Sequence, residues 1–498
     1  MKEKNNHNTT ISRRSFIGTA ATAAAGFSIV PSMVMGKTLG HVAPSDKLNI
    51  VGVGIGGMGF ANLKNMASQN IVGLCDVDWK YSKRVFDHFP KAKKYKDWRR
   101  LFEEMDNDFD GVMISTADHT HAIIAAHAMT MGKHVYLQKP LSHSVYESRL
   151  LTKLADKYGV ATSMGNQGAS EEGVSLVTEW IANGEIGEVT KVEAFTDRPI
   201  WPQGLNRPSQ GQWVPDTLDW DLFVGPAKMR PYSEVYHPWN WRGWWDFGTG
   251  ALGDMACHIL HPVFVGLELG YPSKVQGTST LLLNDSAPTA QTVKLTFPAR
   301  KAKKKMKIKF PKLEVIWYDG GLRPVLPDGW PSGKNMNFDG GGVIFHGTKD
   351  TLICGCYGRK PWLLSGRTPD APKFRRRINV SHEMDWVRAC KETETNRVDT
   401  SSDFSEAGPF NEMVVMGVLA VRLQSLYKEL LWDGEKMEFT NIGENDVVDT
   451  VVKDGFKIHD GHPSFDKTWT GPVPARAFAA ELIKHTYREP WSLPDMPK

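Results

Sequence analysis

The chain has 498 residues, of which 41% are hydrophobic and 23% are charged. This length exceeds one ordinary compact core, and the composition excludes a disordered chain or a fibrous repeat. The formal net charge of +4 arises from 60 basic and 56 acidic residues, an excess too small to indicate a nucleic-acid-binding protein. The five cysteines are an odd number in a long chain, so we expect buried thiols rather than a disulfide framework.

The first 36 residues have the order of an export signal. The pair Arg13-Arg14 precedes Phe16 and an apolar run rich in Ala and Gly, which extends from Gly18 to Met35. The paired arginines resemble a twin-arginine signal, so we expect residues 1–36 to be removed and the mature protein to be periplasmic. An ordinary secretion signal and an uncleaved anchor are the alternatives. No later segment is long and apolar enough to span a bilayer, which predicts no stable membrane insertion after processing.

The pattern from Lys47 to Asp76 predicts a dinucleotide-binding unit. A predicted strand at 48–54 runs into the glycine loop, which consists of Gly52, Gly54 and Gly57. A predicted helix at 58–68 and a second predicted strand at 71–75 follow, and the second strand ends at Asp76. The glycines permit a tight turn, close approach to a pyrophosphate and close packing of helix on strand, and the helix N-terminus offers N–H groups to phosphates. The Asp76 carboxylate accepts hydrogen bonds from ribose hydroxyls and repels a 2′-phosphate, which favours NAD over NADP.

Apolar strands continue to alternate with amphipathic helices as far as about residue 168. The expected strands are 110–115, 134–137 and 160–164, and the expected helices between them are 122–131 and 144–158. This alternation predicts a parallel, doubly wound Rossmann sheet over 47–168, with its ligand at the carboxyl ends of the strands. Polar residues at or just after those ends are the further candidates for cofactor contacts: Thr116, His121, Gln138, Lys139 and Asn166.

Three segments together resemble the Gfo/Idh/MocA family, named for glucose-fructose oxidoreductase and inositol dehydrogenase. They are the glycine loop, the segment from Ser115 to His121, and Gln138-Lys139-Pro140, and the resemblance covers about residues 47–272. It implies an NAD-dependent oxidoreductase acting on a sugar or sugar derivative, with Lys139 between nicotinamide and substrate. The family tripeptide is usually Glu-Lys-Pro, so Gln138 replaces an acid with a neutral amide and leaves open how Lys139 is charged and oriented.

A second motif lies at the start of a predicted helix, where Asp254 and His258 are four residues apart and share one face. It resembles the family's motif in which an Asp and a His flank the reacting carbon. We expect His258 to take a hydroxyl proton and Asp254 to hold the substrate or orient the histidine, with Lys139 as the third catalytic residue. Read without Lys139, the pair would be a helix cap and a core histidine. His261 continues the face, but two histidines at this spacing are a weak metal signature, and we expect no metal.

Residues 169–445 are expected to form an α+β domain with an open, mainly antiparallel sheet. Its expected strands are 275–283, 291–297 and 306–310, and its expected helices are 381–391 and 409–430. The helix at 381–391 would carry His382 toward the substrate, and the outer side of the sheet would form the interface of a homo-oligomer. Residues 446–498 are expected to be an extension whose part beyond 453 is irregular.

Seven of the 17 tryptophans cluster between residues 201 and 245, and they are Trp201, Trp213, Trp220, Trp239, Trp241, Trp244 and Trp245. Flat aromatic rings suit the C–H faces of pyranoses, although rings of this kind also fill cores and interfaces. We expect one or two of these rings to line the pocket of a sugar or glycoside substrate.

Three functions fit these residues. The first is a net sugar dehydrogenase or reductase, in which diffusible NAD turns over. The second is a redox-neutral glycoside-cleaving enzyme that keeps its NAD, oxidises a ring hydroxyl, eliminates the glycosidic oxygen and reduces the product. Export gives weight to this second function, because the periplasm has no known free pool of NAD. The third, a noncatalytic sugar-binding protein stabilised by NAD, is disfavoured by the combination of Lys139 and His258.

Overall fold

We describe the protein from a computed structural model, which covers residues 46–302, 306–336, 338 and 340–497. The expected export signal, residues 1–36, lies outside the described residues. Residues 49–498 form one unit that contains both large β-sheets. Within the described ranges, no helix combines the length and the apolar character needed to cross a lipid bilayer.

The first sheet has six parallel strands in the order β3-β2-β1-β4-β5-β6. Their bounds are β1 Asn49–Val53, β2 Asn70–Cys75, β3 Lys93–Tyr95, β4 Gly111–Ile114, β5 His134–Leu137 and β6 Thr162–Met164. The strand order reverses between β1 and β4, and doubly wound sheets bind their ligands at this point. The predicted parallel Rossmann sheet is confirmed.

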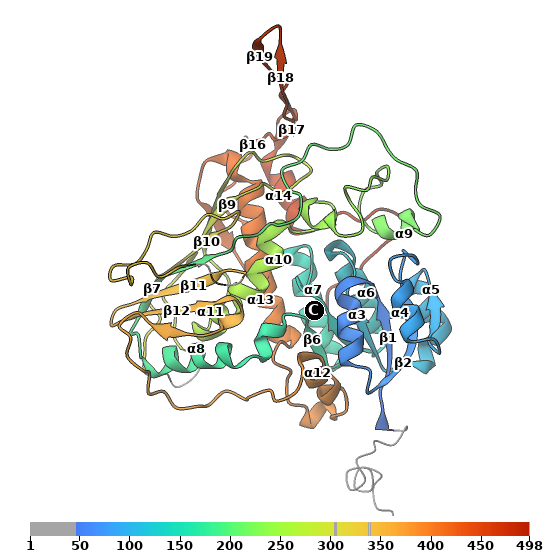
Figure 1. Ribbon diagram of the computed structural model, residues 1–498, viewed down its shortest axis with the longest axis horizontal. Helices are drawn as coiled ribbons and strands as arrows, with labels where there is room; N and C mark the ends of the chain where they lie inside the picture. The colour runs from blue at the N-terminus through green and yellow to red at the C-terminus, as the bar shows by residue number, and fades with distance from the viewer. Residues whose placement is uncertain (1–45, 303–305, 337, 339, 498) are drawn as a thin grey trace, which may run out of the picture. The chain divides into compact units, whose positions relative to one another are not determined.

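Five helices connect these strands (Figure 1). They are α3 Gly57–Asn65, α4 Lys83–His88, α5 Trp98–Met105, α6 Asp118–Thr130 and α7 Val145–Tyr158. α7 begins with a capping box in which Ser144 and Glu147 each accept from the other's backbone N–H, and Gly159 ends it with a φ of 57°. α6 begins four residues earlier than expected, because its polar first turn is buried and shows no helical periodicity.

The second sheet has nine strands in the order β13-β12-β11-β7-β10-β9-β8-β14-β15, and only the β7–β10 pair is parallel. Their bounds are β7 Val189–Phe195, β8 Lys274–Ser279, β9 Gln291–Phe297, β10 Leu313–Tyr318, β11 Gly342–Gly347, β12 Thr351–Gly355, β13 Trp362–Leu363, β14 Leu430–Asp433 and β15 Glu438–Phe439. The expectation of an open, mainly antiparallel sheet is confirmed.

Two predicted elements of this region are wrong in position. Residues 306–310 are no strand, since they contribute only an isolated bridge from Phe310 to Arg300, and the strand lies at β10 instead. The helix expected at 409–430 is α13 Phe404–Arg422, which starts where the Asp403 side chain accepts from Ser405 N. A proline more often marks the first turn of a helix, but Pro409 lies inside this one.

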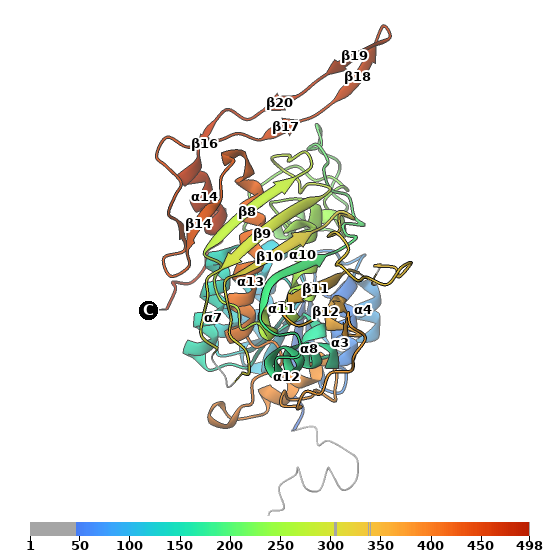
Figure 2. The same cartoon turned by 90° about the vertical axis from the view of Figure 1, so that its left-hand side faces the viewer.

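The remaining helices are α8 Glu172–Asn183, α9 Trp220–Val224, α10 Gly250–Ile259, α11 His261–Gly266, α12 His382–Cys390 and α14 Ala475–Ile483. α13 joins the two sheets, because it packs against α7 on one side and against β8 and β9 on the other. Val51 of the first sheet, Val315 of the second and Phe410 of α13 belong to one buried hydrophobic cluster. This shared core fixes the ends of the first sheet relative to α10, which packs on α13 (Figures 1 and 2).

The expectation of an irregular C-terminal stretch is wrong for most of its length. Residues 447–474 form a two-stranded ribbon, α14 follows it, and residues 484–497 lie against the first sheet's helices. The ribbon strands are β16 Val447–Val448, β17 Val451–Lys453, β18 Phe456–His459, β19 His462–Phe465, β20 Thr468–Trp469 and β21 Val473–Pro474. In the last segment Trp491 packs near Trp98 of α5, and Arg488 donates to Asp221 Oδ1 of α9.

Candidate active site

The glycine loop leads from β1 into α3. Gly54 has a φ of 72°, a conformation that favours glycine. A Cβ atom on Gly54 would lie 2.6 Å from the backbone nitrogen of Thr116, so only glycine lets these segments approach this closely. α3 begins at Gly57 without a side-chain cap and without an acidic residue in its first turn. Its free N–H groups are therefore suited to bind phosphate oxygens.

Asp76 lies at the end of β2 beside the glycine loop. One carboxylate oxygen accepts from Ile55 N at 3.0 Å and from Gly56 N at 3.2 Å, and the other accepts from Asp78 N at 2.9 Å. Burial raises the pKa of Asp76, and these donors oppose the shift. Because a carboxylate offers about four acceptor positions, Asp76 keeps room for a ribose hydroxyl while it braces the loop.

Lys139 follows β5 and reaches α10 of the second half of the chain. Its Nζ atom donates to Asp254 Oδ1 at 2.8 Å and to the Asp254 carbonyl oxygen at 3.0 Å. Arg242 Nε donates to the same Oδ1 at 3.2 Å. Burial alone would raise the pKa of Asp254, but the charges of Lys139 and Arg242 outweigh it and hold that pKa well below its usual value. Asp254 is therefore an ionised carboxylate shared by two cations.

His258 lies one helical turn after Asp254 on α10 and is 6% exposed. Burial, together with the charge of Lys139, lowers the pKa of His258 well below its ordinary value, so the ring is neutral at pH 7. Its Nδ1 atom is buried and has no hydrogen-bond partner within the part of the chain that the structure describes. The edge of the ring meets Tyr357, with centroids 4.7 Å apart. A neutral imidazole has one unprotonated ring nitrogen, which can accept a proton.

Two residues of α6 hold these groups in place. Asp118 Oδ2 accepts from Thr249 N at 3.1 Å and from Thr249 Oγ1 at 2.8 Å, which anchors the start of α10, and burial raises the pKa of Asp118 to about 7. His121 lies with Nδ1 2.8 Å from the Pro140 carbonyl oxygen and Nε2 3.2 Å from that of Thr116. Burial lowers the pKa of His121 to about 4, so this neutral ring is a structural link behind the lysine loop.

Gln138 has a structural reason to be an amide. Its Nε2 donates to Asn62 Oδ1 at 3.0 Å, while Asn62 Nδ2 donates to Glu383 Oε1 at 2.8 Å. Asn62 Oδ1 also accepts from Ser115 Oγ at 3.2 Å, and at residue 138 an amide can supply the second donor to this oxygen, whereas a carboxylate cannot. A glutamate at residue 138 would have no donor for the Asn62 oxygen, and its carboxylate would lie in the same buried network as the carboxylate of Glu383.

A cavity of about 1010 Å³ connects the glycine loop to the lysine and α10 motifs. Asp76 and Gly54 line one end, and Lys139, Asp254 and His258 line the other. The structure thus brings together the two motifs, which lie more than 100 residues apart in the chain. This arrangement places Lys139, Asp254 and His258 at one end of a groove whose other end is formed by the glycine loop of the dinucleotide-binding fold.

Most of the predicted site residues line this cavity, and they are Gly54, Gly57, Asp76, Thr116, Gln138, Lys139, Asp254 and His258. Three predicted cofactor residues do not line it. Gly52 packs β1 against α3, since a Cβ there would meet Ile55 and Leu63. His121 lies behind the lysine loop, and the Asn166 side chain is buried with no hydrogen-bond partner among the described residues.

Two family models match the chain. The model described as oxidoreductase family, NAD-binding Rossmann fold, matches residues 47–166, and the model of that family's C-terminal alpha/beta domain matches residues 181–299. The chain belongs to the Gfo/Idh/MocA oxidoreductase family. Its cofactor is NAD.

Curated relatives of this Gfo/Idh/MocA protein carry two kinds of name. Glycosyl hydrolase family 109 protein 1 of a Shewanella species is 28% identical over 211 residues, which are 37% of this chain and 45% of that protein. The alpha-N-acetylgalactosaminidase of Shewanella oneidensis is 27% identical over 233 residues, 41% and 50% of the two chains. Inositol 2-dehydrogenase of Salmonella paratyphi B is 27% identical over 142 residues, which are 27% of this chain and 42% of that protein. This chain therefore spans half or less of the length of these relatives.

A solved structure confirms the fold. The WlbA dehydrogenase from Chromobacterium violaceum, crystallised with NADH and UDP-GlcNAcA, superimposes with a TM-score of 0.52 at 16% identity. The match covers 78% of this chain and 96% of that one. In this Gfo/Idh/MocA chain the residues present fit NAD, because the Gly54 cradle would be filled by a Cβ and Asp76 keeps an acceptor position for ribose.

The tryptophan-rich segment covers the cavity and supplies residues that the sequence did not indicate. Trp201, Trp239 and Trp241 line the cavity, which is one more ring than expected. The Arg242 guanidinium lies over the rings of Trp239 and Trp241, at 3.9 and 4.3 Å from their centroids. Tyr357, with a φ of 65°, comes from the turn after β12. No sequence signal marked Arg242 or Tyr357, because only the tertiary structure brings them to Asp254 and His258.

Other candidates lie away from the chemistry. His261 Nε2 lies 3.0 Å from Glu406 Oε1, and the described ranges hold no group of three metal-ligating side chains. The expectation that His382 reaches the substrate is wrong, because its Nε2 lies 2.7 Å from the buried Met164 carbonyl oxygen and its Nδ1 lies 2.7 Å from Ser170 Oγ. All five cysteines are buried and none of them forms a disulfide, which agrees with the expectation that no disulfide framework is present.

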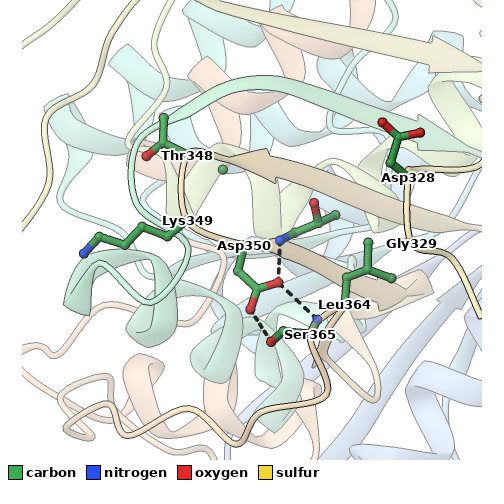
Figure 3. Close-up of a pocket in the computed structure, with 9 residues that line it drawn as sticks. Asp328, Gly329, Thr348, Lys349, Asp350, Leu364 and Ser365 are labelled. Atoms are coloured by element: carbon green, nitrogen blue, oxygen red, sulfur yellow. Dashed lines mark hydrogen bonds between the residues drawn. The ribbon is translucent and has the colours of Figure 1, made fainter.

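A second pocket, of about 480 Å³, lies beside β11 and β12 (Figure 3). Asp350 is its central acid, but that carboxylate already accepts from Thr351 N at 2.8 Å and from Ser365 Oγ at 2.5 Å. These hydrogen bonds use the Asp350 carboxylate to stabilise a local turn. This pocket therefore does not have the composition of a reactive site.

Proposed function

We propose that this protein oxidises a ring hydroxyl of a sugar or sugar derivative. The observation that carries the proposal is the meeting of Lys139, Asp254 and a neutral, buried His258 at one end of the dinucleotide cavity. Bound NAD supplies the hydride acceptor. His258 takes the hydroxyl proton as the C–H bond breaks, the C=O bond forms and the hydride leaves the same carbon.

Lys139 has the donors that this step needs. Its ammonium group has three N–H donors, and two of them are used by the carbonyl and carboxylate oxygens of Asp254. The third is available to the substrate oxygen, whose negative charge grows as its proton leaves. Asp254, held ionised by Lys139 and Arg242, orients Lys139 and accepts from a neighbouring substrate hydroxyl.

A sugar substrate is supported by the aromatic side of the cavity. Trp239 lines the cavity and is 46% exposed, so its ring has free surface for the C–H groups of a pyranose, while Trp201 and Trp241 line the same cavity and are largely buried. The relatives named inositol 2-dehydrogenase and alpha-N-acetylgalactosaminidase act on compounds of this class by name.

One observation favours a second candidate, the redox-neutral glycoside-cleaving enzyme with retained NAD. The tryptophan-rich segment bridges the end of β2: Thr217 O accepts from Trp79 N, Val77 O accepts from Asp219 N, and His237 Nε2 lies 3.0 Å from Asp78 Oδ2. These contacts enclose the end of the groove that takes the adenosine, which favours slow release of the nucleotide. The relatives named as glycosyl hydrolase family 109 proteins support the same reading.

In this second reaction the ketone made by oxidation acidifies the neighbouring C–H. A base on the chain removes that proton, the glycosidic C–O bond breaks, water adds to the resulting double bond, and the hydride returns to the ketone. The net reaction is hydrolysis with no change in oxidation state. Export to the periplasm by the Arg13-Arg14 signal belongs to this proposal, because a retained cofactor needs no outside supply.

The test separates the two reactions. We expect the purified protein to release NAD on denaturation, detected by absorbance at 260 nm and by mass spectrometry. Aryl glycosides are then supplied without added cofactor. Repeated release of the aglycone, with no net nicotinamide reduction, supports the redox-neutral reaction, whereas product that appears only in proportion to added NAD supports the dehydrogenase. Neither reaction with any sugar or glycoside in the panel would reject the proposal.

A further inference from the structure

The C-terminal ribbon, residues 447–474, projects from the rest of the unit as a single arm (Figure 2). Its three strand pairs, β16–β21, β17–β20 and β18–β19, follow one another along its length. The arm turns at Asp460 and Gly461, whose φ values of 49° and 77° suit the tight hairpin turn that an Asp-Gly pair favours. The register of the tip is therefore fixed by its turn.

The tip of the arm has one apolar and one polar face. Phe456 pairs with Phe465 and Ile458 pairs with Pro463, so these four side chains share a face. The intervening residues Lys457, His459, His462 and Ser464 occupy the other face. Phe456, Ile458 and Phe465 are 60%, 63% and 76% exposed, so no described residue covers the apolar face.

A hairpin of this kind needs a covering surface. An isolated two-stranded hairpin is marginally stable in water at best. Phe456, Phe465 and Trp469, which is 53% exposed, together present roughly 400 Å² of aromatic surface. Each partner in a stable interface buries about 800 Å², so two arms exchanged between two copies supply a large part of one such interface.

The charge of the arm points to a protein partner. It has three lysines and four aspartates, a net charge of −1 with neutral histidines, and Lys453–Asp466 and Lys467–Asp454 pair within it. An anionic lipid surface or a nucleic acid would be repelled. Soluble proteins associate most often with copies of themselves through a closed two-fold axis, in which each arm is met by its equivalent.

We propose that the arm docks on a second copy of this chain, with the Phe456–Ile458–Phe465 face buried in a symmetric homo-oligomer. The test compares two matched variants in the same hairpin. Phe456→Ser, Ile458→Ser and Phe465→Ser remove the apolar face, while Lys457→Ser and His459→Ser change the opposite face as a control. Molar mass is measured by sedimentation velocity between 0.1 and 10 μM.

We expect an oligomer for the wild type and the control, and at least a tenfold weaker self-association for the apolar-face variant. A third variant, with Gly455–Asp466 replaced by Asn-Gly, should lose association in the same way without a change in catalytic rate per active site. A monomeric wild type would refute the proposal, as would an apolar-face variant that associates like the wild type. Flotation of a monomeric wild type with phosphatidylcholine vesicles would identify a membrane as the occupant instead and would equally refute it.

Discussion

The Nζ atom of Lys139 lies 2.8 Å from the Asp254 carboxylate, although 115 residues separate the two in the chain. The contact joins the carboxyl edge of the first sheet to α10, and Arg242 closes it from a third segment. A carboxylate buried between two cations is held ionised, and the cations are held in one geometry. Burial lowers the pKa of the neighbouring His258, and the charge of Lys139 lowers it further, while the charge of Asp254 opposes the shift.

The first prediction concerns this pair. Lys139→Met and Asp254→Asn should each lower turnover by about a hundred- to ten-thousand-fold, while NAD binding changes little, because these groups act on the substrate rather than on the cofactor loop. Reduction of bound NAD by substrate, followed at 340 nm, reports the chemistry, and the nucleotide content of the purified variants reports binding. Near-normal reduction in either variant would remove that residue from the mechanism.

The second prediction concerns pH. His258 must be neutral to accept a proton, and burial with the Lys139 charge puts its pKa well below 6.5. Activity should therefore stay level from pH 8 to below pH 6.5 and fall only in more acidic solution. In Lys139→Met the acidic limb should move to higher pH, because a positive charge that opposed protonation is gone. His258→Ala should lose turnover by about a hundred- to ten-thousand-fold at every pH. An acidic limb at the same pH in the wild type and Lys139→Met would contradict this coupling.

The third prediction concerns cofactor choice. Asp76→Ala should weaken NAD binding and narrow the preference over NADP by about tenfold or more (~1.4 kcal/mol), because it removes an acceptor for ribose and a charge that repels a 2′-phosphate. Arg84 lines the same end of the cavity and offers a partner for that phosphate. Asp76→Asn is the matched control, since it keeps an acceptor for Ile55 N and Gly56 N without the charge. Calorimetry that shows equal NAD and NADP binding by the wild type would overturn the assignment.

The fourth prediction concerns the amide at residue 138. Gln138→Glu should destabilise the fold by about 1–3 kcal/mol, because a buried carboxylate then faces Asn62 without a donor. The double change Gln138→Glu with Glu383→Gln restores one carboxylate and one amide around Asn62 and should recover most of the loss. Denaturant unfolding measures both variants. No recovery in the double variant would argue against the Asn62 network as the reason for Gln138.

The fifth prediction concerns export and rests on the sequence of the N-terminus. Changing Arg13 and Arg14 to lysine should leave uncleaved precursor in the cytoplasm. Immunoblots of cytoplasmic and periplasmic fractions make the comparison. Normal amounts of mature protein in the periplasm would reject the twin-arginine assignment and leave an ordinary secretion signal.

Local patterns were sufficient for the first sheet, whereas the Lys139 motif and the Asp254–His258 motif were assigned through their resemblance to the family. The glycine loop, the strand that ends at Asp76 and the helix that carries Asp254 and His258 all have signatures within a few residues, because turn chemistry and apolar periodicity act over that distance. The same patterns were unreliable where burial overrides periodicity, as in the polar first turn of α6 and around Pro409 in α13.

The sequence by itself therefore determined the cofactor fold, the two motifs and the family resemblance. Only the tertiary structure decided that Lys139 meets Asp254, that Arg242 and Tyr357 join them, and that His382 does not. The tertiary structure also showed that much of the C-terminal stretch expected to be irregular forms an arm with one apolar face. The physical reason is that such contacts depend on the shared core around α13, which sets distances between segments far apart in the chain, and no local pattern encodes those distances.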